Sequence, residues 1–240
     1  MKKFGLMGYP LGHSLSPLIH SEIFKRTGYD GEYSLYETKP ENFDVLSSLT
    51  GFNVTIPYKE AIIPYCKRLD DSASCGAVNC VRDKTGYNTD VYGFHKAIDA
   101  LGADLSSRVC LLGYGGSGKM IADRVRKAGG KLTIATRENI NELNGDFDLL
   151  INSTPVGMYP NIEDSPIDFK SINVKYVLDL IYNPAETKLL SLAKQKGAKV
   201  MNGLIMLVWQ AVKSHEIWYG AGLSDNDADE IIQKITASLS

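Results

Sequence analysis

Short apolar runs alternate along the chain with longer stretches in which apolar residues recur every three or four positions. The short runs predict buried strands, and the longer spacing predicts helices with one apolar face. This alternation predicts an α/β fold with mostly parallel sheets. The strands are expected at 4–8, 33–37, 52–55, 77–82, 109–112, 132–135, 149–152, 177–179 and 199–201. The helices are expected at 17–27, 89–101, 119–128 and 186–196, with two more at the end of the chain, from Leu204 and up to Ser240.

The pattern restarts after the helix that Gly102 closes, which predicts two domains. We expect a first domain made of 1–101 plus 204–240, and a second domain made of 102–203. No strand follows the two C-terminal helices, and the first of them has a wide apolar face. These helices are therefore expected to return to the first domain and to pack on it.

Composition narrows the class of protein. The 240 residues carry a formal net charge of −2, with 44% hydrophobic and 22% charged residues. That balance is typical of a globular protein and argues against a nucleic-acid or membrane-surface partner. No apolar run approaches the roughly 20 residues of a membrane span, and the N-terminus does not resemble a signal peptide. We expect a cytoplasmic protein, with four reduced cysteines and no metal site.

A glycine-rich loop follows the predicted strand that ends at Leu112. Gly113-Tyr114-Gly115-Gly116-Ser117-Gly118 joins this strand to a helix, the context of a dinucleotide phosphate loop. Glycines let the backbone approach a pyrophosphate, and the helix N-terminus offers N–H donors. A tight strand-to-helix turn is the alternative. The functional interpretation makes 102–203 a Rossmann-like dinucleotide-binding domain.

The choice of cofactor is expected to depend on the end of the next strand, at Thr136-Arg137-Glu138. An acidic residue there favours NAD, because it accepts from the ribose 2′-hydroxyl. Arg137 can instead pair with the 2′-phosphate of NADP. We predict NADP, with Glu138 pointing away; a plain surface arginine is the alternative.

Polar residues interrupt the predicted strand at 52–55. Asn53 and Thr55 alternate, so both side chains are expected on one face. A helix is expected to begin near Lys59, and a cation there opposes the helix dipole, which suits a lysine with a chemical role. Asp90 opens a later predicted helix and can either serve its N-terminus or orient Lys59. A solvated surface lysine is the alternative for Lys59.

Two serines, Ser14 and Ser16, precede the first predicted helix. They can act as an N-cap. They can also present two hydroxyl donors to a carboxylate.

Several motifs occur in one order along the chain and together resemble the shikimate dehydrogenase family. They are GYPLGHSLSPLIH, GFNVTIPYKE, GAVN, GYNTDVYGF, LGYGGSGK, INSTPVGM, DLIYNPAETKLL and GLIMLVWQA. The resemblance covers nearly the whole chain. It implies NADP-dependent reduction of 3-dehydroshikimate to shikimate. We expect a monomer or a homodimer.

The resemblance also implies residue roles. Lys59 and Asp90 match the catalytic pair, and Ser14 and Ser16 match ligands of the substrate carboxylate. The other matches to substrate ligands are Asn53, Thr55, Asn79, Tyr182 and Gln210. The matches to cofactor contacts are Gly113, Tyr114, Gly115, Gly116, Ser117, Thr136, Arg137, Leu180 and Gly203.

Shikimate is a small anion with three hydroxyls, and this set of Ser, Thr, Asn and Gln side chains suits it. Three alternatives stay open: a paralogue that acts on quinate or uses NAD, a non-catalytic shikimate-binding module, and a dehydrogenase of the methylenetetrahydrofolate type. Cys80 and Tyr114 depart from the family pattern, as does Thr136. These departures bear on the cofactor more than on the substrate.

Overall fold

The computed structural model describes residues 1–12, 14–37 and 43–239. The chain divides into two compact units. The first comprises Met1–Gly93 and Val208–Ile235, and the second comprises Phe94–Leu207 with the end of the chain from Thr236. The backbone passes from one unit to the other within helices α2 (Asp90–Leu101) and α5 (Leu204–Tyr219).

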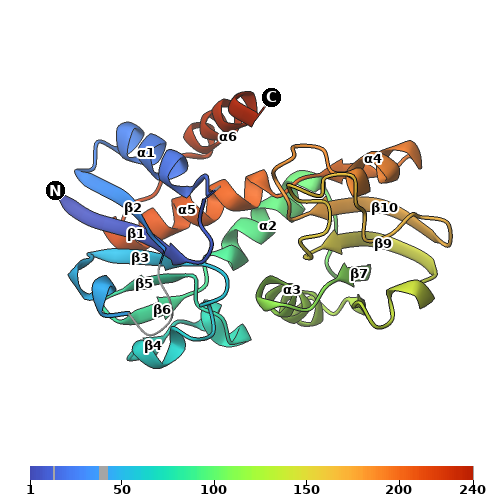
Figure 1. Cartoon of the computed structure of the whole chain (residues 1–240), viewed down its shortest axis with the longest axis horizontal. Coiled ribbons are helices and arrows are strands. Elements are labelled where there is room, and N and C mark those ends of the chain that lie inside the picture. The colour runs from blue at the N-terminus through green and yellow to red at the C-terminus, as the bar shows by residue number, and fades with distance from the viewer. Residues whose placement is uncertain (13, 38–42, 240) are drawn as a thin grey trace. The chain divides into compact units, whose positions relative to one another are not determined.

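A six-stranded sheet forms the centre of the first unit (Figure 1), with strand order β2-β1-β3-β5-β6-β4. Strands β1, β2 and β3 run parallel, β5 is antiparallel to its neighbours β3 and β6, and β6 pairs in parallel with β4. The strands are β1 (Lys2–Gly8), β2 (Gly31–Glu37), β3 (Gly51–Val54), β4 (Arg68–Leu69), β5 (Cys80–Arg82) and β6 (Thr85–Tyr87). The helices are α1 (Ser16–Thr27) and α6 (Asp225–Leu239), with the 3-10 turns Phe43–Ser48, Ile63–Tyr65 and Asp71–Cys75.

The short strands β4 and β6 were absent from the sequence prediction. Strands β5 and β6 form a hairpin whose two turn residues, Asp83 and Lys84, have positive φ values of 49° and 56°. Such turns usually contain Asn-Gly or Asp-Gly. Asp83-Lys84 has no glycine, so the usual hairpin signal is missing there.

The C-terminal helices pack on the first unit, as predicted. Trp218 of α5 is almost fully buried and stacks on Phe4 of β1, with ring centroids 4.6 Å apart. Gly51 lies against the same indole, since a Cβ at this position would come within 2.4 Å of the Trp218 ring nitrogen. Helix α6 contributes Lys234, whose ammonium pairs at 2.8 Å with the buried carboxylate of Glu22 on α1.

The second unit contains a five-stranded parallel sheet of order β11-β10-β9-β7-β8. Figure 1 shows α3 and α4 on opposite sides of this sheet, as in doubly wound folds. The strands are β7 (Arg108–Leu112), β8 (Lys131–Ala135), β9 (Gly145–Asn152), β10 (Ile172–Asp179) and β11 (Lys199–Met201). The helices are α3 (Gly116–Lys127) and α4 (Lys188–Gln195), with the 3-10 turn Ile140–Glu142.

The strand order of this sheet reverses between β7 and β9, which makes this the topological switch point. After β7 the chain goes to β8 on one side, and it then crosses to β9 on the other. Ligands of such sheets bind outside the carboxyl ends of the strands at this point. The glycine-rich loop after β7 is therefore in the expected place for a phosphate loop.

Candidate functional site

The polar residues of the first unit meet at one edge of its sheet. The carboxyl ends of β1, β3 and β6 and the amino end of β5 all lie at this edge, because β5 runs antiparallel to β3 and β6. The loop after β1 carries Ser14 and leads into Ser16 at the start of α1, the loop after β3 carries Lys59, and β6 leads into Asp90. Asn79 immediately precedes β5. The sheet topology thus brings together residues that are far apart in the sequence.

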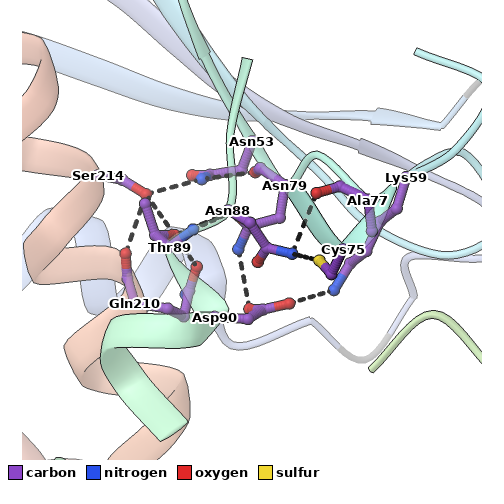
Figure 2. Close-up of polar contacts among 10 residues, drawn as sticks. All are labelled: Asn53, Lys59, Cys75, Ala77, Asn79, Asn88, Thr89, Asp90, Gln210 and Ser214. Atoms are coloured by element: carbon purple, nitrogen blue, oxygen red, sulfur yellow. Dashed lines mark hydrogen bonds and ion pairs between the residues drawn. The ribbon is translucent and has the colours of Figure 1, made fainter. Parts of the chain in front are cut away.

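Lys59 and Asp90 form a close ion pair. The Lys59 ammonium lies 2.5 Å from Asp90 Oδ2, and the two side chains are 14% and 11% exposed. The other carboxylate oxygen, Oδ1, accepts a hydrogen bond of 2.8 Å from the Asn79 amide. Figure 2 shows these three side chains pointing toward one another. Asp90 is therefore held from both sides, and it fixes the position of the lysine.

A buried hydrogen-bond network continues from this pair to helix α5. Asn79 Oδ1 accepts from the backbone N–H of Thr89 at 2.6 Å. The Thr89 hydroxyl lies 3.3 Å from Ser214 Oγ and 3.5 Å from Gln210 Oε1. Asn53 donates to Ser214 Oγ at 2.9 Å and to the Asn79 carbonyl at 3.1 Å. The network (Figure 2) joins β3, the start of β5, α2 and α5 into one polar wall.

The helix predicted to begin near Lys59 is not present, so that prediction was wrong. Lys59 lies in a series of turns between β3 and the 3-10 turn Ile63–Tyr65. Its backbone carbonyl accepts from the Val78 N–H at 2.8 Å, which ties this loop to the segment before β5. The lysine is placed by tertiary contacts and by Asp90, rather than by a helix dipole.

Ser14 and Ser16 lie at the start of α1, but neither is its N-cap. Leu15 occupies the cap position and makes no side-chain capping bond. The Ser14 hydroxyl accepts from the Ser16 N–H at 3.3 Å, and Ser16 is buried. Thr55 lies at the same edge of the sheet, since its methyl group covers Gly8 and its N–H bonds the Met7 carbonyl at 2.8 Å.

Sequence reasoning missed three members of the network. Thr89 and Asn88 precede Asp90 within the GYNTD motif, so their place in that motif was a usable signal. Asn88 donates to the Ala77 carbonyl at 3.1 Å and so holds the segment before Asn79. Ser214 follows Gln210 by four residues, one helical turn, and this spacing puts both on one face of α5.

The glycine-rich loop of the second unit joins β7 to α3 and leaves part of its backbone uncovered. Gly113 has φ +88°, and a Cβ there would lie 2.8 Å from the Thr154 side chain. A Cβ on Gly118 would lie 2.7 Å from the Gly113 carbonyl. Gly115 and Gly116, in contrast, face open space at the N-terminus of α3, where the Ser117 N–H is among the donors without an intrahelical partner. Bare backbone and free N–H groups there fit a phosphate ligand.

Tyr114, inside this loop, is 41% exposed. Thr136 begins the loop after β8, and its N–H donates to Asn139 Oδ1 at 2.7 Å. Arg137 is exposed beside it. The Glu138 carboxylate accepts a short hydrogen bond from the Thr136 hydroxyl. That bond is the main cause that lowers the pKa of Glu138.

Leu180 and Gly203 are brought together after β10 and β11. A Cβ on Gly203 would lie 2.1 Å from the Leu180 carbonyl, so only glycine fits there. Tyr182 is half-buried two residues after Leu180, and burial raises the pKa of its hydroxyl. This predicted substrate ligand belongs to the second unit, whereas the others belong to the first.

Residues 6–81 match the family model described as the shikimate dehydrogenase substrate binding domain. The chain is 37% identical to the shikimate dehydrogenase (NADP(+)) of Clostridium perfringens, with 98% of each sequence covered. The chain belongs to the shikimate dehydrogenase family.

Solved structures of the shikimate dehydrogenase family share this fold. The chorismate mutase/shikimate 5-dehydrogenase fusion protein from Clostridium acetobutylicum matches with a TM-score of 0.90 and 32% identity, covering 100% of this chain and 98% of that one. Shikimate 5-dehydrogenase from Thermus thermophilus, solved in complex with NADP(H) and shikimate, matches with a TM-score of 0.86 and 30% identity, covering 98% and 99%. The predicted family, two-domain α/β fold and oxidoreductase class are confirmed.

Two further findings concern the described residues only. Within ranges 1–12, 14–37 and 43–239, no helix is long and apolar enough to cross a membrane. In the same part of the chain, no group of three or more His, Cys, Asp or Glu residues could hold a metal ion. All four cysteines are free thiols.

Proposed function

We propose that this chain catalyses the reversible NADPH-dependent reduction of 3-dehydroshikimate to shikimate. The substrate is bound by the domain predicted at 1–101 plus 204–240, and NADP by the domain predicted at 102–203. The observation that carries the proposal is the Lys59–Asp90 pair, with its carboxylate fixed by Asn79, at the edge of a polar wall. Identity of 33–37% to several NADP-dependent relatives over nearly the full chain supports the same reaction.

The substrate is held by polar side chains of the first unit. Ser14 and Ser16 bind the carboxylate at the start of α1, where N–H donors also favour an anion. Thr55 and Gln210 bind ring hydroxyls. The two serines and the Thr55 and Gln210 side chains suit a small, highly hydroxylated anion, because each hydroxyl of such a ligand needs a donor or an acceptor.

Asn53 and Asn79 have protein partners that limit how they can bind substrate. Asn53 donates to Ser214 and to the Asn79 carbonyl, and its Oδ1 accepts from the Tyr33 hydroxyl at 2.8 Å. Asn79 bonds both Asp90 and Thr89. A substrate hydroxyl must share these groups, so both residues act as ligands that also position the wall.

Lys59 is the proton donor. As the C3 ketone is reduced, negative charge grows on its oxygen, and the ammonium stabilises this charge and gives up a proton. Asp90 keeps the ammonium in place and balances its charge within a largely buried site. In the direction of oxidation, the neutral amine of Lys59 takes the hydroxyl proton back.

The second unit holds the cofactor. The backbone of Gly113–Ser117 binds the pyrophosphate, Thr136 and Arg137 face the 2′-phosphate, and Leu180 and Gly203 flank the nicotinamide. When bound, NADPH supplies the hydride for the C3 carbon. Tyr182 completes the set as a further substrate contact.

A spectrophotometric assay tests the proposal. Purified protein is given shikimate or quinate with NADP or NAD, and the absorbance of the reduced cofactor is followed. We expect formation of NADPH that depends on shikimate. Reduction with quinate alone, or no reduction with any of the four pairs, would contradict the proposed function.

A further inference from the structure

The loop after β8 carries opposite charges on consecutive residues. Arg137 and Glu138 are both exposed, and they directly follow Thr136 at the carboxyl end of the strand. This end of the second strand is where dinucleotide-binding sheets receive the ribose of the adenosine half. Both charges therefore lie at the end of the sheet where such folds bind the part of the cofactor in which NADP differs from NAD.

The Glu138 carboxylate is held in this position. It accepts a hydrogen bond from the Thr136 hydroxyl. Thr136 is itself fixed by Asn139, which bonds its N–H at 2.7 Å and the Ile134 carbonyl at 3.2 Å. These contacts keep the carboxylate against the end of the strand instead of leaving it free in solvent.

At this position a carboxylate favours NAD, whereas a guanidinium favours NADP. The carboxylate accepts a hydrogen bond from a ribose 2′-hydroxyl, as acidic residues do in NAD-binding sheets. It repels a 2′-phosphate, which carries between one and two negative charges near neutral pH. Arg137 attracts the same phosphate.

We propose that Glu138 is a specificity-determining residue that narrows the preference of this enzyme for NADP over NAD. It binds the 2′-hydroxyl of NAD and opposes Arg137 in binding the 2′-phosphate of NADP. This inference rests on the proposed function only in taking a nicotinamide dinucleotide as the ligand of the second unit. The effect of Glu138 on the preference is limited by screening, because both charges are exposed to water and salt.

Binding of two adenosine fragments isolates the effect without any turnover. The fragments are 2′,5′-ADP and ADP, which differ by the 2′-phosphate, and their dissociation constants are measured by titration calorimetry. The test variant is Glu138→Gln, which removes the charge and keeps the shape. The matched control is Glu142→Gln, which removes an exposed carboxylate four residues further along.

In Glu138→Gln we expect the affinity ratio of 2′,5′-ADP to ADP to rise about threefold to tenfold, as for the loss of one exposed repulsive charge. Glu142→Gln should leave the ratio unchanged, and Arg137→Ala should lower it. The difference between Glu138→Gln and wild type should shrink as salt is added. An unchanged ratio in Glu138→Gln, an equal change in both fragments, or an equal change in the Glu142→Gln control would overturn the inference.

The same preparations separate this inference from the proposed function. If wild type reduces NADP with shikimate but the ratio does not respond to Glu138→Gln, only the specificity role fails. If the ratio responds but no shikimate-dependent reduction occurs, the proposed reaction fails and the role of Glu138 stands. If wild type binds neither fragment, the second unit does not hold such a cofactor and the inference is overturned.

Discussion

The Lys59 ammonium lies at the edge of the polar wall, 2.5 Å from Asp90 Oδ2. Lys59→Met keeps a similar apolar stem and removes the charge. We expect turnover to fall at least about 100-fold, the lower bound for loss of a general acid. The dissociation constant of shikimate should change much less, because Ser14, Ser16 and Gln210 are untouched.

Asp90 serves as the partner in a double-mutant comparison. Asp90→Asn should also slow turnover, and the double variant should be little slower than Lys59→Met, because the two residues act as a unit. Steady-state kinetics and shikimate binding measure both effects. Near-normal turnover in Lys59→Met, with weakened binding, would make Lys59 a substrate ligand only.

At this scale, the sequence predicts residue types better than it predicts their partners. Lys59, Asp90 and Asn79 were singled out, and they do meet in the structure. Ser214 was not, because it is brought to Thr89 by the packing of α5, and no local pattern encodes a contact across 125 positions. The bond between the Thr136 hydroxyl and the Glu138 carboxylate was likewise not predicted, because sequence position does not show how an exposed side chain will turn.

Helix α4 shows how a single side chain can join an element to a buried group. Thr187 is its N-cap and accepts from the Leu190 N–H at 3.3 Å. The same hydroxyl donates at 2.6 Å to Asp179, a fully buried carboxyl at the end of β10 whose pKa is raised by burial. The second oxygen of Asp179 accepts from Asn152 of β9 and from the Ile181 N–H.

Thr187→Ala should therefore lower the free energy of unfolding more than the loss of an ordinary helix cap does. Loss of the cap and of a bond to a buried carboxyl together predict a decrease of about 2–3 kcal/mol in the free energy of unfolding. Urea unfolding followed by far-ultraviolet circular dichroism measures it, because both tryptophans, Trp209 and Trp218, lie in the first unit. Thr187→Ser keeps the hydroxyl and should recover most of the loss; an equal loss in both variants would contradict this account.

Elements with strong apolar periodicity were predictable, and elements fixed by pairing were not. Strand β11 has the predicted bounds, Lys199–Met201, and α1 begins only one residue before its prediction. Strand β4 has just two residues, Arg68 and Leu69, and depends on its partner β6. The helix expected near Lys59 failed because Pro57 permits a helix start but does not require one.

The stability of the whole molecule is expected to depend on a buried histidine pair that joins α1 to α5. His20 Nδ1 lies 2.9 Å from His215 Nε2, and both side chains are at most 1% exposed. His20 also stacks on Tyr33, with centroids 3.7 Å apart. Burial lowers the pKa of His215 to about 3 and also lowers that of His20.

These shifts predict a loss of stability in mild acid. Both histidines are neutral in the folded state but take up protons near pH 6.5 once unfolded, so the unfolded state binds more protons below that pH. The free energy of unfolding should fall as pH drops from about 6.5 toward 3, by up to about 1.4 kcal/mol per pH unit for each histidine. Above about pH 7 this dependence should disappear.

Urea unfolding followed by tryptophan fluorescence, between about pH 7 and pH 5, measures this slope above the range of the carboxylates. His215→Gln keeps a polar atom near Nε2 and removes one titrating group. The number of protons taken up on unfolding, which the slope measures, should therefore decrease by about one. If the variant is too unstable to measure at pH 5, the interval between about pH 7 and pH 6 suffices. An unchanged slope would assign the acid sensitivity to other groups.

The first unit is assembled from both ends of the chain, and this has a consequence for its synthesis. A ribosome finishes β1 to β6 and then the Phe94–Leu207 part of the second unit before it makes Trp218, a delay on the order of ten seconds at ordinary elongation rates. During that time Phe4 and Gly51 have no indole to cover them. The domain that is begun first is thus completed only after most of the second unit has been made, and a nascent chain halted before α5 presents an open apolar face to chaperones and proteases.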